Sequence, residues 1–92
     1  MPTKKVAVKD QIVLNDVKLR IRSAIEKQFG SVAKFINSEQ GKKMGGQKIR
    51  VYLYDSGAVS FKTLAKLCEY FGIGTLTRTV EVQRIYRYQL TA

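Results

Sequence analysis

The chain has 92 residues, which is room for one small domain, and 45% of them are apolar, so we do not expect wholesale disorder. Lysine and arginine together number 17 against seven aspartates and glutamates, a net charge of +10 that favours polyanionic partners, nucleic acid before an anionic membrane. Histidine is absent and the seven acids are scattered, so we expect neither an enzyme nor a metal or other cofactor.

The only cysteine, Cys68, leaves no internal disulfide to form and suits a reducing cytoplasm. It falls on the apolar side of a predicted helix, so we interpret it as a core residue. We recognise no signal peptide and no apolar run long enough to span a membrane. The expected location is therefore the cytoplasm, with no membrane partner and no small-molecule substrate.

The N-terminal half begins with residues 1–14, which read as a basic arm or a short strand around Val6 and Val8. Asn15 or Asp16 is the predicted cap of a helix that runs through Gln28 and ends at a glycine. Ser31 is the predicted cap of a second, short helix reaching about residue 38. Three glycines within residues 39–46 predict a loop there, because glycine disfavours helix.

The stretch from Gln47 to Asp55 predicts a helix with two different faces. Ile49, Tyr52 and Leu53 share one face by their spacing and can hold the helix to a core. The opposite face carries amide, guanidinium, methyl and phenol groups, which suit contacts outside the protein: Gln47, Arg50, Val51 and Tyr54. A protruding helix of this kind fits the major groove of DNA.

The C-terminal part is predicted to change from helix to strand. A regular amphipathic helix follows the cap Ser60 and ends at Gly72. Residues 75–90 are rich in threonine, valine and tyrosine and contain no glycine, proline, asparagine or aspartate, so we expect one long strand. The expected partner of that strand is either the N-terminal segment or the same strand of a second copy.

In this order the signals resemble the lambda-repressor/Cro-like (XRE-type) helix-turn-helix family. SVAKFI is similar to the first helix of the pair, with Ala33 in the small packing position, and KIRVYLYDSG is similar to the end of a recognition helix. VSFKTLAKLCEYFGIG is similar to the helix that packs behind the pair. The chain departs from the family in its long 39–46 turn. The resemblance implies a mainly α, compact four-helix domain with a C-terminal strand for dimerisation.

We therefore predict that residues 1–92 form a single helix-turn-helix domain (arm 1–14, helical core 15–74, strand 75–92) that binds double-stranded DNA as a homodimer and regulates transcription, with repression the expected action. The predicted base contacts are Gln47, Arg50, Val51 and Tyr54. The predicted phosphate contacts are Lys34, Lys42, Lys43 and Lys48, and the predicted dimer interface consists of Val80, Val82, Tyr86 and Tyr88.

Two other functions remain open at this stage. One is sequence-tolerant binding of DNA or RNA, favoured by the tyrosines and arginines interleaved in the C-terminal strand. The other is a protein-interaction module that uses the same helical scaffold without touching nucleic acid.

Overall fold

The structure is a computed structural model that describes residues 5–6, 8–55, 59–80 and 85–91. Within these ranges the chain is mainly helical with β structure at the C-terminal end, as the sequence predicts, and that β structure is an antiparallel pair of strands. The described helices number five rather than four: α1 (Val8–Phe29), α2 (Val32–Asn37), α3 (Glu39–Lys43), α4 (Lys48–Tyr54) and α5 (Phe61–Tyr70). The strands are β1 (Lys5–Val6), β2 (Thr75–Val80) and β3 (Ile85–Thr91).

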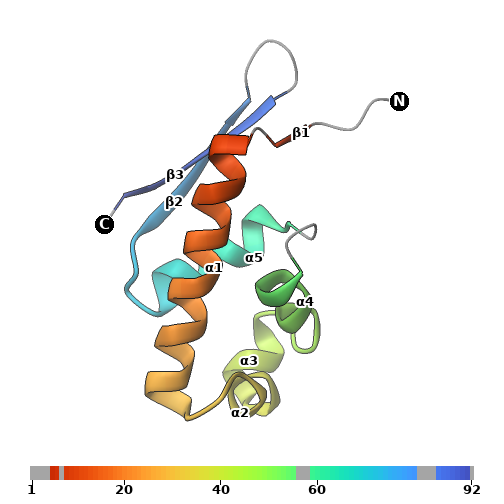
Figure 1. Ribbon diagram of the computed structural model, residues 1–92. Helices are drawn as coiled ribbons and strands as arrows, with labels where there is room; N and C mark the ends of the chain where they lie inside the picture. Colours follow the sequence, from red (N-terminus) through yellow and green to blue (C-terminus); the bar gives the residue numbers. More distant parts are fainter. Residues whose placement is uncertain (1–4, 7, 56–58, 81–84, 92) are drawn as a thin grey trace.

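The long helix α1 organises the molecule (Figure 1). The β2–β3 pair lies beside its N-terminal part, and α2 and α3 lie at its opposite end. α1 begins at Val8, so the predicted cap at Asn15 or Asp16 is wrong. Leu14 is fully buried and extends the apolar stripe of the helix by one turn toward the N-terminus. Asp16 instead lies on the exposed side, where it pairs with Arg20 at 2.9 Å.

The predicted loop at residues 39–46 contains a helix, so that prediction is wrong. Ser38 begins α3 by accepting the backbone N–H of Gly41 at 3.1 Å. A Cβ atom on Gly41 would lie 1.9 Å from the carbonyl oxygen of Phe35, so this glycine permits the close approach of α2 and α3. Gly45 and Gly46, with φ of 136° and 59°, make the break between α3 and α4.

The C-terminal segment forms two strands, so the prediction of one long strand is wrong. β2 and β3 are antiparallel, with a register that runs from Thr75 opposite Thr91 to Val80 opposite Tyr86. The residues between the two strands, 81–84, lie outside the described part of the chain. β1 pairs with β3 in parallel, with Val6 opposite Tyr86. Of the two expected partners, the N-terminal segment is the one that pairs in the structure, and β3 is the central strand.

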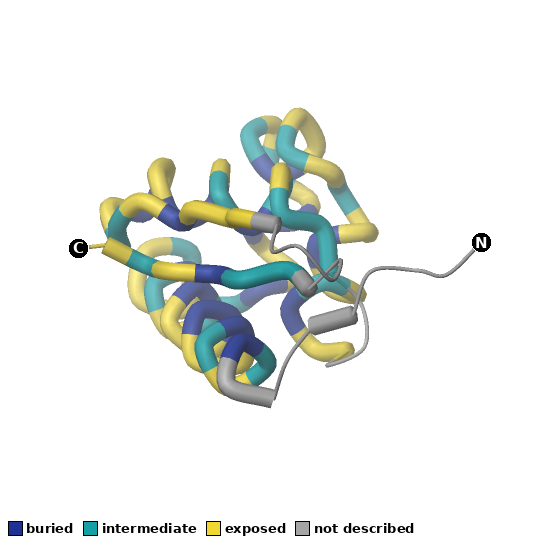
Figure 2. Tube along the Cα trace, turned by 90° about the horizontal axis from the view of Figure 1, so that it is seen from above, coloured by how far each residue is buried: buried dark blue, intermediate teal, exposed yellow. Residues whose placement is uncertain are grey.

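The core lies between α1, the shorter helices and one face of the sheet. Figure 2 shows buried positions recurring along α1 between exposed ones. An aromatic cluster closes the core at the C-terminal end of α1, where the Phe35 ring lies 4.9 Å from that of Phe29 and 5.2 Å from that of Phe71. The fully buried side chains come from α1, α2, α4 and α5: Leu14, Val17, Ile21, Ile25, Phe35, Ile36, Ile49, Leu53, Leu64, Leu67 and Cys68.

Candidate nucleic-acid interface

The short helix α4 divides its residues between the core and the solvent. Ile49 and Leu53 are buried and Tyr52 is half-buried, as the spacing predicts. On the other side, the residues predicted to contact bases are all exposed: Gln47, Arg50, Val51 and Tyr54. A helix of only seven residues has little stability of its own in water, so the buried pair is what fixes the exposed set in space.

The C-terminal end of α4 is tied to α1 by a buried lysine. The ammonium group of Lys18 donates a hydrogen bond of 2.9 Å to the backbone carbonyl of Asp55, the residue that closes α4. Burial lowers the pKa of Lys18 below its ordinary value, the nearby Asp55 opposes this, and Arg22 adds to it. Lys18 lies four residues after Leu14 and three before Ile21, so its helical spacing alone places it on the buried side of α1.

Arg22 of α1 is a second residue that the sequence analysis did not place at this site. Its guanidinium carbon lies 4.9 Å from the centre of the Tyr54 ring, within the range of a cation–π contact. The ring of Tyr54 is about half exposed and rests against α1. Arg22 therefore adds positive charge beside the exposed face of α4.

A hollow of about 480 Å³ separates α4 from the end of α1 and the start of α2. Arg50 and Tyr54 line one side of it, and Ser31 and Ala33 line the other. Ser31 begins α2 as predicted, accepting the backbone N–H of Lys34 at 3.1 Å. Ala33 is exposed, so it does not provide the close packing that the resemblance implies. In this region Gly41 of α3 provides the close packing.

The four lysines predicted to contact phosphates come from three successive helices. All of them are exposed, and among the described residues none has an acidic side chain within ion-pair distance: Lys34 on α2, Lys42 and Lys43 on α3, and Lys48 on α4. The predicted position of the middle pair on a loop is corrected, because both belong to the last turn of α3. Each side chain can therefore offer its full charge to an anion outside the protein.

The strand residues predicted to form a dimer interface are placed differently. Tyr88 is only 6% exposed, and burial raises the pKa of its hydroxyl above the ordinary value. Its ring belongs to the core of its own chain, which corrects its assignment to the interface. Tyr86 is half-buried and its ring lies 4.5 Å from the guanidinium carbon of Arg78. The side chain of Val80, and Val82 altogether, lie outside the described part of the chain.

Comparisons with known proteins add no assignment: protein-family models, curated proteins and solved structures all gave no match to this chain. Among the residues that the structure describes, no three His, Cys, Asp or Glu side chains come together to hold a metal ion. Over the same ranges, every helix is too short or too polar to cross a bilayer. What the site can do therefore follows from its exposed cations and the exposed face of α4.

Proposed function

We propose that this protein is a sequence-specific DNA-binding regulator of transcription, acting as a repressor, that inserts α4 into the major groove. The observation that carries the proposal is the division of α4, in which Ile49 and Leu53 anchor the helix while Gln47, Arg50 and Val51 stay exposed. A helix held in this way can enter a groove about 12 Å wide without losing its packing.

In this proposal α2 and α4 are the two helices of a helix-turn-helix, and α3 occupies the place of the usual tight turn. Both α2 and α4 contact α1 and each other, which supports a fixed angle between them. Gly41 supports the same view, because its close approach to Phe35 joins α3 tightly to α2. The long turn is thus a packed helix, and the relative position of α2 and α4 does not depend on a loose loop.

The chemistry of the exposed face fits base edges. Arg50 can donate two hydrogen bonds to guanine O6 and N7, and Gln47 can pair with adenine N6 and N7. Val51 can meet a thymine methyl group, and Tyr54 lies at the end of the same face. The surrounding lysines are placed for phosphates, which fix the position of the protein but carry no sequence information.

Sequence-tolerant binding by the strands has less support. It needs aromatic rings that are open to stacking with bases. Tyr88 is buried, and the guanidinium of Arg78 lies over both Tyr86 and Phe61, at 4.5 and 4.8 Å from the ring centres. The third function, a protein-interaction module, predicts that the protein binds no DNA.

The test is selection of bound duplexes from a random DNA pool at about 150 mM salt, where much non-specific attraction is screened. We expect an enriched motif with two-fold symmetry. Arg50→Ala should lose about 5- to 150-fold in affinity for that motif, which corresponds to about 1–3 kcal/mol for a bidentate contact. Lys27→Ala removes the same charge from an exposed position on α1 and is the matched control.

The outcomes separate the three functions. Binding without enrichment favours sequence-tolerant recognition, and the absence of binding favours the interaction module. Equal affinities of the Arg50→Ala and Lys27→Ala proteins for the selected motif would reject the assigned role of α4, even if the protein binds DNA.

A further inference from the structure

α1 carries an exposed apolar ridge that the fold of a single chain does not use. Ile12 is 65% exposed and Leu19 is 54% exposed, and no other large apolar side chain in the described part of the chain is more open to solvent. The two residues lie seven positions apart, nearly two turns, so they share one side of the helix. Ser23 continues this side by one more turn and is also exposed.

A hollow borders the ridge on the side of the sheet. It has a volume of about 610 Å³ and lies between α1 and the last part of β3. Ile12 reaches its rim, and half-buried Val13 and Leu90 contribute to its walls. The ridge and the hollow together form a continuous surface with raised and recessed apolar parts. A surface with both features can interlock with a copy of itself across a two-fold axis.

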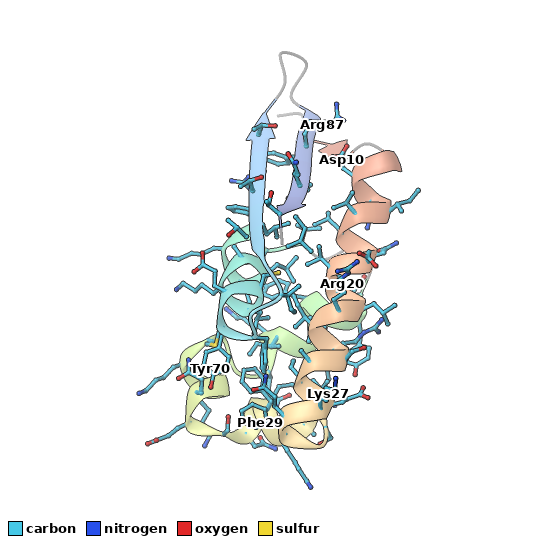
Figure 3. The ribbon with its side chains drawn as sticks, turned by 90° about the vertical axis from the view of Figure 1, so that its left-hand side faces the viewer. Asp10, Arg20, Lys27, Phe29, Tyr70 and Arg87 are labelled. Carbon is cyan, nitrogen blue, oxygen red and sulfur yellow. The ribbon has the colours of Figure 1, made fainter. Side chains whose placement is uncertain are left out.

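The distribution of charge indicates which molecule can dock on this surface. The two charged residues of the surface, Asp16 and Arg20, pair with each other at 2.9 Å, so their charges cancel (Figure 3 labels Arg20 midway along α1). Two copies of a chain with a net charge of +10 repel each other over most of their surfaces. A neutral, apolar area is where such copies can approach each other.

We propose that a second copy of this chain docks on this surface, with the two α1 helices antiparallel. In this arrangement Ile12 packs against the partner's Leu19, Leu19 packs against the partner's Ile12, and the axis passes between residues 15 and 16. This contact is the interface of the homodimer predicted from the sequence, and it rests on the proposed function to the extent that a two-fold symmetric DNA motif requires such a dimer. It replaces the strand interface predicted from sequence.

The orientation of α4 agrees with this axis. Successive residues of a helix are about 100° apart, so Lys18 and Arg22, which contact the end of α4, lie roughly 60–100° around α1 from Leu19. The two-fold axis of two antiparallel helices is perpendicular to the plane that contains them. It therefore keeps both α4 helices on one side of that plane and both sheets on the other. A two-fold symmetric DNA site requires this arrangement.

The size of the contact predicts a weak dimer. Residues 8–23 of α1 span roughly 24 Å at about 1.5 Å per residue, and contact over that length gives an interface below about 1,200 Å² in total. We therefore expect dissociation in the micromolar range. Sedimentation equilibrium without DNA, from about 1 to about 200 µM protein, covers that range.

The decisive experiment uses two single variants and their combination. Ile12→Glu and Leu19→Lys should each raise the dissociation constant at least about tenfold, because each puts charge into an apolar contact. The double variant I12E/L19K should regain most of the lost affinity, because the antiparallel arrangement sets Glu against Lys twice. Gln28→Glu, at an exposed position of α1 outside the ridge, should leave the dissociation constant unchanged.

Three results would overturn the proposal: a monomeric parent protein at every concentration, single variants that dimerise like the parent, or a double variant no tighter than the singles. Thermal melting of each variant checks the fold, which should be retained because both positions are exposed. Since the measurement contains no DNA, a failure of DNA binding and a failure of this interface are distinguished.

Discussion

The carboxylate of Asp10 accepts the backbone N–H of Tyr88 at 2.8 Å and so joins the first turns of α1 to the middle of β3. β1 pairs with β3 only as far as Tyr86, and Asp10 takes the next N–H along the same edge. The second carboxylate oxygen lies 3.0 Å from Nε of Arg87 (Figure 3). Asp10 is 3% exposed. Its buried side chain therefore extends the hydrogen bonding of β3 beyond the two residues of β1.

Replacing Asp10 tests how much this connection stabilises the fold. Asp10→Ala leaves a buried backbone N–H without its acceptor and removes an ion pair with Arg87, so we expect the free energy of unfolding to fall by about 2–4 kcal/mol. Asp10→Asn keeps one acceptor oxygen and should cost about half as much. Chemical denaturation measures both. Asp16→Ala, which breaks an exposed pair, is the control and should change stability by less than about 0.5 kcal/mol.

Gly41 gives a second test, because its neighbour is a backbone atom that cannot move aside. Gly41→Ala places a methyl group 1.9 Å from the Phe35 carbonyl oxygen, so α2 and α3 must separate. We expect a loss of about 3 kcal/mol or more in the free energy of unfolding. Gly46→Ala has open space around its Cβ and should cost only about 1–2 kcal/mol from its positive φ. Similar losses in the two variants would show that α3 does not pack as described.

These two residues also show where the sequence predicted the structure and where it did not. Helical spacing predicted α2, α4 and α5 and the two faces of α4, because each buried stripe repeats within its own helix. Gly41 misled the prediction, because glycine disfavours helix on average and only the contact with Phe35 explains it here. Asp10 gave no signal, because its partner lies 78 residues away in the chain.

The strand pair and the site show the same limit. No residue type within residues 75–90 predicted that this segment divides into two strands, which are identified by their register with each other. The exposed residues of α4 were predictable from spacing alone. Lys18 and Arg22 were not assigned to the site, because their roles depend on the position of α4 beside α1.

The buried thiol of Cys68 predicts a change of stability with pH. Burial raises its pKa from 9.0 to about 11, so the folded state holds this proton more tightly than the unfolded state. The contribution of this difference to the free energy of unfolding is fully present below pH 9 and is lost as the pH rises from 9 through about 11. Over that window we expect the parent protein to lose on the order of 2 kcal/mol more than Cys68→Ala.

The measurement is the free energy of unfolding of both proteins at several pH values from neutral to alkaline, under reducing conditions. Tyr88 also has a raised pKa, but both proteins contain it, so its effect cancels in the difference. Parallel curves for the two proteins across the window would show that the thiol does not hold its proton in the way its burial implies.

The exposed lysines predict the salt dependence of DNA binding. Each phosphate contact contributes about −0.9 to the slope of log affinity against log salt concentration. Lys42→Ala and Lys43→Ala should therefore each make the slope shallower by about 0.9, and their combination by about 1.8, without changing the preferred sequence. Lys27→Ala removes the same charge outside the proposed interface and should leave the slope unchanged. If it changes the slope as much as the α3 variants do, general charge and not the placement of α3 beside α4 determines the attraction.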